Sequence, residues 1–381
     1  MGLELRLPSG LHRLRTPEAL DAPEGPITSR VVYAAAHVVA DPLAENGPGA
    51  PAAVDWDTTL AFRRHLWSLG LGVADAMDTA QRGMGLDWSA TRELITRSGA
   101  EARAVGGRLA CGVGTDQLTV ARSLPAVIDA YQEQLAVVEE AGAQPIVMAS
   151  RALAAVAKGP EDYLHVYGEV IDTASQPVIL HWLGEMFDPA LAGYWGGANL
   201  DDATDTVLDL IRENAPRVDG IKVSLLDADR EIALRRALPE GVRLYTGDDF
   251  NYPRLIRGDE VGHSDALLGI FDPIAAVAAA AMRALDVGDT ARYDALMAPT
   301  LPLARHLFAA PTYHYKTGVV FLAWLAGHQS HFTMVAGAQS GRSVSHLTEL
   351  FRLADEAGVL PDPELAVHRM RQFLQVSGVD A

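Results

Sequence analysis

Short apolar runs alternate with longer amphipathic segments along most of this sequence. Eight apolar runs have the length and residue types of buried strands, at 31–39, 72–79, 108–114, 143–150, 176–183, 219–226, 242–249 and 265–271. Segments with helical periodicity lie between several of them, near 57–70, 89–105, 120–141, 160–174 and 200–214. Strands that alternate with helices are typical of βα units and a parallel sheet. The pattern therefore predicts an α/β protein.

The number of units distinguishes the two common parallel architectures. Eight βα units in roughly 250 residues match a TIM (β/α)8 barrel. An open doubly wound sheet usually has fewer strands and a glycine-rich first turn, and no G-x-G-x-x-G motif follows the first predicted strand. We therefore predict a (β/α)8 barrel that forms a catalytic domain over residues 1–286.

The last quarter of the chain has a different pattern. Strand-like runs stop after about residue 286, and helical segments follow near 288–309, 315–328, 343–356 and 362–376. No low-complexity linker precedes these segments, so residues 287–381 are predicted to be a C-terminal helical extension packed on the barrel.

Composition narrows the classes of partner. The chain has 381 residues and a formal net charge of -18, which argues against nucleic acid and anionic membranes because both are bound by clustered basic residues. Its one cysteine, Cys111, excludes an intramolecular disulfide and a cysteine-based zinc site. No apolar run is long enough to span a bilayer, and the N-terminus lacks the apolar core of a signal peptide. We expect a cytoplasmic protein that binds a small molecule.

A lysine interrupts the sixth predicted strand, in the stretch "VDGIKVSLLD" (218–227). Side chains alternate along a strand, so Ile221 and Val223 should face the helices while Lys222 points into the barrel. Active sites of TIM barrels lie at the C-terminal ends of the strands. A lysine in such a pocket has a lowered pKa and can attack a carbonyl to form a Schiff base. The alternative is a structural lysine that reaches solvent or pairs with Asp219 or Asp227.

Several motifs together resemble one family. "QPVILHW" (176–182), "DGIKVS" (219–224), "LYTGDD" (244–249) and "GHSDALLGIFDPIAAVAAAAMRAL" (262–285) are similar, in order and spacing, to strands 5 to 8 of the dihydrodipicolinate synthase and N-acetylneuraminate lyase superfamily of class I aldolases. The resemblance implies a Schiff-base lysine at Lys222, a carbonyl substrate such as a 2-oxo acid or keto-sugar derivative, and no cofactor. It also implies C-terminal helices and a homo-oligomer.

The loop after the second strand departs from that family. Where the family has G-T-T-G-E, which holds the carboxylate of a 2-oxo acid, this chain has "AMDTAQRGMG" (76–85). Thr79 alone approximates the pattern. Arg82 is expected to recruit a carboxylate or phosphate in the same place. Asp78 is expected to bind a sugar hydroxyl or to act as an acid or base, or else to be a hydrogen-bonded carboxylate of the barrel rim.

The proton-shuttling tyrosine of the family has no evident counterpart. His181, at the end of the fifth strand, is the expected substitute because a neutral imidazole in a closed site can accept and return a proton near neutral pH. The alternative is a hydrogen-bonded core histidine. Lys316, in "YHYKTG" (313–318), is expected to belong to a helix start or an interface.

Further polar residues are expected at the same rim. Four residues near the ends of the fifth and seventh strands are predicted to contact the substrate: Glu185, Thr246, Asp248 and Asp249. One of the two aspartates is expected instead to cap the helix that begins near residue 251. Combined with His181, the carboxylates could bind a divalent metal such as Zn, Mn or Mg.

Three functions remain open from the sequence. The favoured one is a Schiff-base lyase or aldolase with Lys222 as nucleophile. The second is a metal-dependent isomerase or hydrolase of a sugar derivative, in which Lys222 only positions the substrate. The third is a barrel without catalytic activity that binds a small ligand.

Overall fold

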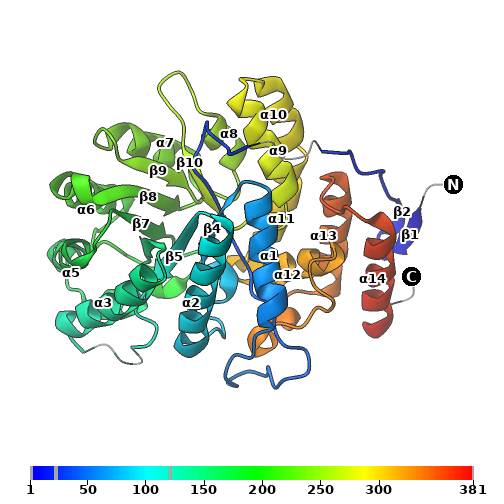
Figure 1. Cartoon of the computed structure of the whole chain (residues 1–381), viewed down its shortest axis with the longest axis horizontal. Helices are drawn as coiled ribbons and strands as arrows, with labels where there is room; N and C mark the ends of the chain where they lie inside the picture. The colour runs from blue at the N-terminus through cyan, green and yellow to red at the C-terminus, as the bar shows by residue number, and fades with distance from the viewer. Residues whose placement is uncertain (1–2, 21–24, 119, 121, 380–381) are drawn as a thin grey trace.

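Eight parallel strands form a closed barrel at the centre of the computed structural model, which describes residues 3–20, 25–118, 120 and 122–379 (Figure 1). The strands are β3 (Val32–Ala35), β4 (Gly72–Asp75), β5 (Leu109–Val113), β6 (Gln144–Val147), β7 (Val178–Leu183), β8 (Val218–Ser224), β9 (Arg243–Thr246) and β10 (Asp265–Leu268). Each pairs with its neighbours in chain order, and β10 pairs with β3 to close the ring. The predicted TIM barrel is therefore confirmed.

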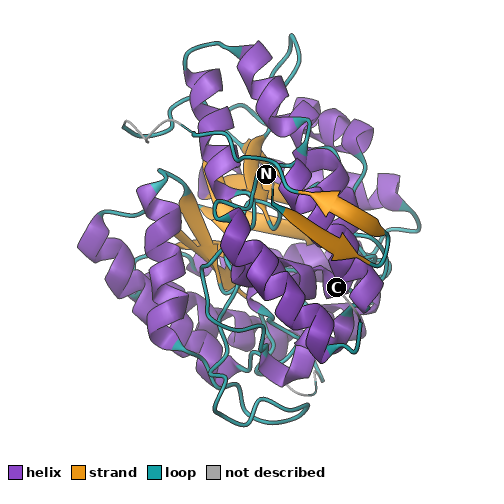
Figure 2. Cartoon of the chain, turned by 90° about the vertical axis from the view of Figure 1, so that its right-hand side faces the viewer, coloured by secondary structure: helices purple, strands orange, loops and turns teal. Residues whose placement is uncertain are grey.

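Helices enclose the barrel on its outside, as Figure 2 shows. They are α1 (Trp56–Ser68), α2 (Trp88–Val105), α3 (Leu124–Glu140), α4 (Arg151–Val156), α5 (Pro160–Thr173), α6 (Leu200–Glu213), α7 (Ala228–Ala237), α8 (Tyr252–Arg257) and α9 (Ala275–Asp286). Short polar side chains begin many of them: those of Asp55, Asp87 and Ser123 accept hydrogen bonds from backbone N–H groups of the first turn. The cap at Ser123 explains why α3 begins later than the predicted start at 120; residue 121 lies outside the described residues.

Alternation along the strands separates two sets of buried side chains. One set fills the barrel interior and includes Tyr33, Ala74, Ile179 and Tyr245. The other set belongs to the larger core between strands and helices. Because the period of a strand is two residues, the side on which any strand residue points follows from its neighbours.

The C-terminal segment forms helices α10 (Thr290–Met297), α11 (Thr300–Leu307), α12 (Tyr315–Leu325), α13 (Val344–Glu356) and α14 (Pro363–Val376). The prediction of one helix over 288–309 is wrong, because Pro299 lacks the N–H that would continue α10 and instead precedes a new helix. All residues of α12 are buried, and this helix contacts both its helical neighbours and the short 3-10 helix η1 (Asp78–Ala80) after β4. The division of the chain at residue 286 stays a prediction.

A two-stranded hairpin that the sequence pattern did not indicate begins the described chain. Strands β1 (Glu4–Leu7) and β2 (Gly10–Arg13) pair antiparallel and lie beside α14 (Figure 1). Nε2 of His12 lies 2.8 Å from a carboxylate oxygen of Asp355 in α13. The hairpin therefore lies against the C-terminal helices. None of the described helices is long and apolar enough to cross a membrane.

Candidate active site

A small cavity lies at the C-terminal ends of the barrel strands. Its walls come from the loop after β4, the ends of β7 and β8, the loops after β9 and β10, and the start of α12. The lining residues are Met77, Asp78, Thr79, Leu183, Phe187, Lys222, Ser224, Asp249, Gly269 and Tyr315. Three hydroxyl groups, two carboxylates and one amine thus face a common space.

Lys222 points into this cavity, as the alternation along β8 predicts. Ile221 and Val223 on either side of it belong to the outer core, and Lys222 itself is only 7% exposed. Burial lowers the pKa of its ammonium group, while the nearby carboxylates of Asp78 and Asp249 oppose this shift. Within the described part of the chain, its Nζ makes no hydrogen bond or ion pair, so the amine is available to a ligand.

The structural alternative for this lysine is wrong. Asp219 accepts a hydrogen bond from the hydroxyl of Tyr245 at 2.6 Å. Asp227 caps α7 by accepting a hydrogen bond from the backbone N–H of Arg230 at 3.0 Å. Neither carboxylate pairs with Lys222, because each has another hydrogen-bond partner.

A glycine directly after the adjacent strand β9 leaves space for the lysine side chain. A Cβ atom at Gly247 would lie 2.8 Å from Cε of Lys222 and would overlap Oγ of Ser224. Any side chain at this position would therefore displace the amine or the hydroxyl.

The two consecutive aspartates after β9 have different roles. Asp248 stabilises the turn that follows it, because its Oδ1 accepts hydrogen bonds from the backbone N–H groups of Phe250 and Asn251 at 2.8 and 3.0 Å. Asp249 lines the cavity, and its Oδ1 accepts a hydrogen bond from the N–H of Ile270 at 2.9 Å. Burial raises the pKa of Asp249 to about 7, although Lys222 and the Ile270 N–H oppose the shift. Of the two aspartates, Asp249 is therefore the one that faces the cavity.

A tyrosine from the helical extension completes the cavity. The hydroxyl of Tyr315, at the start of α12, lies 2.9 Å from Oγ1 of Thr79. Burial raises the pKa of Tyr315 well above its ordinary value, and the charge of Asp78 adds to this effect. The Tyr315 ring stacks on Phe308 with a centroid separation of 4.4 Å. Sequence reasoning missed Tyr315, and the nearest signal was the "YHYKTG" segment that contains it.

Lys316 lies next to this tyrosine but does not line the cavity. Its Nζ donates a hydrogen bond to the carbonyl oxygen of Tyr313 at 3.2 Å and lies 4.8 Å from the centroid of the Tyr315 ring. Burial lowers the pKa of Lys316 to about 8, and Asp78 partly opposes the shift. The ammonium group of Lys316 thus packs over the Tyr315 ring and is not part of the cavity wall.

His181 lies in the barrel interior, beside Lys222 on the neighbouring strand. It is completely buried, and burial followed by the charge of Lys222 lowers the pKa of its imidazole well below the ordinary value. Nε2 lies 3.3 Å from Oγ of Ser224, whereas Nδ1 has no partner among the described residues. The imidazole does not line the cavity. Its contact with a residue of the cavity wall is the one with Ser224.

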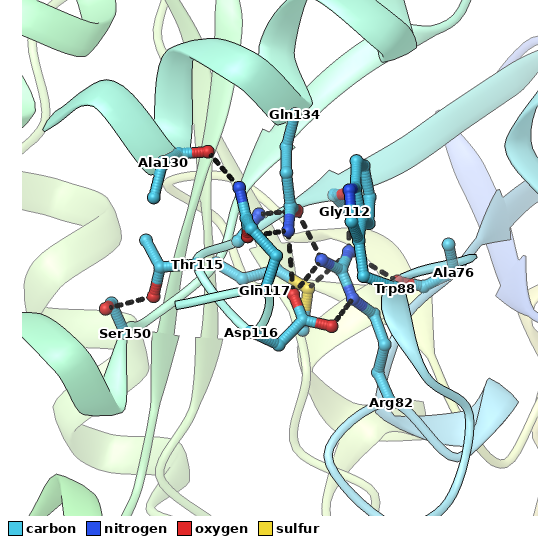
Figure 3. Close-up of polar contacts among 12 residues, drawn as sticks. Ala76, Arg82, Trp88, Gly112, Thr115, Asp116, Gln117, Ala130, Gln134 and Ser150 are labelled. Atoms are coloured by element: carbon cyan, nitrogen blue, oxygen red, sulfur yellow. Dashed lines mark hydrogen bonds and ion pairs between the residues drawn. The ribbon is translucent and has the colours of Figure 1, made fainter. Parts of the chain in front are cut away.

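Arg82 is held by protein atoms, as Figure 3 shows. Its Nη1 donates to the carbonyl oxygens of Ala76 and Gly112 at 3.2 and 2.6 Å. Nε donates to Asp116, and Nη2 donates to both Asp116 and Gln134. These contacts occupy all the N–H groups of a guanidinium, so the geometry offers no donor for the expected carboxylate or phosphate.

The remaining predicted residues are dispersed. Glu185 is exposed on the turn after β7. The side chain of Thr246 points away from the interior and donates a hydrogen bond to Glu231 of α7 at 3.0 Å. The residues considered for a metal therefore do not share one rim, and no group of three or more His, Cys, Asp or Glu side chains in the described ranges could hold a metal ion.

A wider cleft of about 580 Å³ adjoins the cavity and shares Asp78 and Leu183 with it. Its polar lining includes Thr115 and Ser150, whose hydroxyl groups lie 2.6 Å apart. A larger space with polar groups in its walls therefore lies next to the inner cavity.

Comparisons with known proteins agree with this architecture. The family model described as "Protein of unknown function (DUF993)" matches residues 8–379. A search of curated proteins found no match. Similar solved structures include dihydrodipicolinate synthase from Thermotoga maritima, with 15% identity, a TM-score of 0.63 and coverage of 87% of this chain and 99% of that chain.

Two further similar structures were solved with pyruvate. The Acinetobacter baumannii dihydrodipicolinate synthase complex has 16% identity and a TM-score of 0.64, with 87% of this chain and 100% of that chain covered. The prophage protein YagE from E. coli K12 has 14% identity and a TM-score of 0.64, with 92% and 99% covered. The predicted resemblance to this superfamily is thus confirmed as a shared fold.

Proposed function

We propose that this chain, which belongs to the family described as "Protein of unknown function (DUF993)", is a Schiff-base-forming lyase of the aldolase type that acts on a small carbonyl compound. The observation that carries the proposal is the position of Lys222. It combines burial, a lowered pKa and an unpaired amine, within the described residues, with a place at the strand ends where barrel enzymes hold their substrates.

The reaction follows from the groups around the amine. The neutral amine of Lys222 attacks the substrate carbonyl carbon, and loss of water from the carbinolamine gives a protonated imine. The bond between the α- and β-carbons then breaks. Its electron pair forms the double bond of an enamine, and the β-carbon becomes an aldehyde as its hydroxyl loses a proton. Protonation of the enamine and addition of water release the second product and regenerate the amine.

Three routes are available for the protons in these steps. Tyr315 and Thr79 form a hydroxyl pair at the cavity wall. Asp249 has a pKa of about 7 because it is buried, so it can both accept and donate a proton near neutral pH. His181, as the sequence suggested, is proposed to act only through Ser224. Asp78 faces the cavity and is proposed to bind the substrate.

The proposed reaction fits two substrate classes, a 2-oxo acid and a keto-sugar derivative. The two similar structures solved with pyruvate support the first class. The hydroxyl and carboxylate groups of the cavity support the second. A homo-oligomer also remains a proposal.

Reductive trapping tests the proposal directly. The protein is incubated with borohydride and a panel of ketoses and 2-oxo acids, and peptide mass spectrometry locates any added mass. We expect a stable adduct on Lys222, with the mass of the carbonyl compound less one oxygen atom. The Lys222→Arg variant should keep the fold but lose the adduct, because a guanidinium stays protonated.

Lys158→Arg is the matched control, since that residue precedes α5 far from the cavity. It should form the adduct as the wild type does. If no carbonyl compound modifies Lys222, or if turnover survives in Lys222→Arg, the Schiff-base proposal is wrong. Loss of turnover with a chelator and its return with Mn or Zn would instead support the metal-dependent alternative.

A further inference from the structure

The charges around Lys222 distinguish between the two substrate classes. The cavity wall holds two carboxylates, Asp78 and Asp249, against the single amine of Lys222. The other polar groups are the hydroxyls of Thr79, Ser224 and Tyr315. No arginine, histidine or second lysine is part of this wall among the described residues.

The nearby cations are directed elsewhere. Arg82 donates its N–H groups to Asp116, Gln134 and backbone carbonyls. Lys316 donates to the carbonyl oxygen of Tyr313 and lies over the Tyr315 ring. Arg151, which lines the adjoining cleft, pairs with Asp188. A substrate carboxylate next to the reacting carbonyl would therefore face Asp78, with no arginine, histidine or second lysine of the described cavity wall beside it.

The hydrogen-bonding capacity of the cavity wall also favours a substrate with hydroxyl groups over one with a carboxylate. An ionised carboxylate only accepts hydrogen bonds, so a substrate carboxylate could not pair with Asp78. A hydroxyl group donates one hydrogen bond and accepts others. Hydroxyl groups on the carbons next to the carbonyl can donate to Asp78 and Asp249 and accept from Thr79 or Tyr315.

From this arrangement we infer that the substrate is a neutral hydroxylated carbonyl compound, of the ketose type, and not a 2-oxo acid. The inference rests on the proposed Schiff-base function. Asp78 and Asp249 bind the hydroxyl groups beside the carbonyl, and the adjoining cleft receives the rest of the sugar chain. The same two carboxylates stabilise the positive charge of the protonated imine once it forms.

Two three-carbon probes test this inference. Dihydroxyacetone has a neutral hydroxymethyl group on each side of its carbonyl, whereas pyruvate has a carboxylate on one side. Each is incubated with the full chain and borohydride under the same conditions, and the modified fraction of Lys222 is measured by peptide mass spectrometry. We expect the dihydroxyacetone adduct to exceed the pyruvate adduct by at least about tenfold, because juxtaposed like charges disfavour pyruvate.

Asp78→Asn provides the complementary measurement. Removal of the negative charge should raise the pyruvate adduct and lower the dihydroxyacetone adduct, so the ratio of the two should fall by about tenfold. Asp209→Asn is the matched control, because Asp209 is exposed on α6, and its ratio should equal that of the wild type. Circular dichroism checks that each variant is folded, and Asp249→Asn replaces Asp78→Asn if the latter does not fold.

The outcomes separate the two proposals. A wild-type protein that traps pyruvate in preference to dihydroxyacetone overturns the substrate inference and leaves the Schiff-base function supported. An unchanged ratio in both aspartate variants also overturns the inference. A Lys222 that neither probe modifies overturns the Schiff-base function, and the inference falls with it.

Discussion

The hydroxyl of Tyr315 lies 2.9 Å from Oγ1 of Thr79, and this contact joins the helical extension to the loop after the second barrel strand. The two residues are 236 positions apart in the chain. The C-terminal helices therefore do more than cover the barrel, because one of them supplies a wall of the candidate active site.

This hydroxyl pair should contribute to the stability of the folded protein. Tyr315→Phe and Thr79→Val are each expected to lower the free energy of unfolding by about 0.5–1.5 kcal/mol, the usual net value of a buried hydrogen bond. Denaturant unfolding of both single variants and the double variant measures the coupling. Additive losses would show that the two hydroxyls do not interact.

Gly247 should be intolerant of a side chain. Gly247→Ala places a methyl group against Lys222 and Ser224, so the variant is expected to lose most of its borohydride-trapped adduct. Gly262→Ala is the matched control, since a Cβ there meets no atom within 4 Å. Equal trapping in both variants would show that the site has room that the structure does not indicate.

Arg82 should be a structural residue. Arg82→Lys loses most of the hydrogen bonds to Asp116, Gln134 and the backbone, and we expect the free energy of unfolding to fall by about 2–4 kcal/mol. The exposed Arg97, paired with Glu93, is the control; Arg97→Lys should cost less than about 0.5 kcal/mol. A normal unfolding curve for Arg82→Lys, with weaker ligand binding, would instead restore the predicted role in carboxylate recognition.

Glu231 should make stability depend on pH. Burial raises the pKa of Glu231 to about 8, although hydrogen bonds from Ser264 and Thr246 oppose this shift. Between the ordinary pKa and this raised value the folded protein binds one more proton than the unfolded chain, so the free energy of unfolding falls as pH rises through that interval. It should be lowest above pH 8.

Glu231→Gln should remove this part of the pH dependence. The variant is expected to gain stability relative to the wild type from pH 5 to pH 8, by on the order of 3–4 kcal/mol at the upper limit. Thermal unfolding at a series of pH values provides the measurement. A difference that is constant across this range would contradict the raised pKa.

The predicted division at residue 286 can be tested by truncation. A chain that ends there lacks α12, whose residues are all buried and include Tyr315. We expect it to aggregate or to be digested rapidly, because the helices contact the strand-end loops. Limited proteolysis that released a stable barrel from the full chain would show that the extension is dispensable for folding.

The sequence alone determined the barrel and the direction of its key lysine. Eight apolar runs alternating with helices indicate a parallel barrel because each unit must bury its apolar face. The two-residue period of a strand sets the side of each residue: Lys222 points inward between Ile221 and Val223. The same period, applied to Tyr245 and Gly247, would have shown that Thr246 points outward.

Only the tertiary structure decided which residues share the site. Tyr315 reaches the cavity because α12 packs over the strand ends, and no local pattern encodes that packing. The sequence did not show that Arg82 has partners. Asp116 and Gln134 belong to a later part of the barrel, the loop after β5 and helix α3, and they accept hydrogen bonds from the Arg82 guanidinium. Periodicity is a property of neighbouring residues, whereas hydrogen-bond partners and cavity walls depend on contacts between distant segments. The sequence therefore determined where Lys222 points, and the tertiary structure determined what surrounds it.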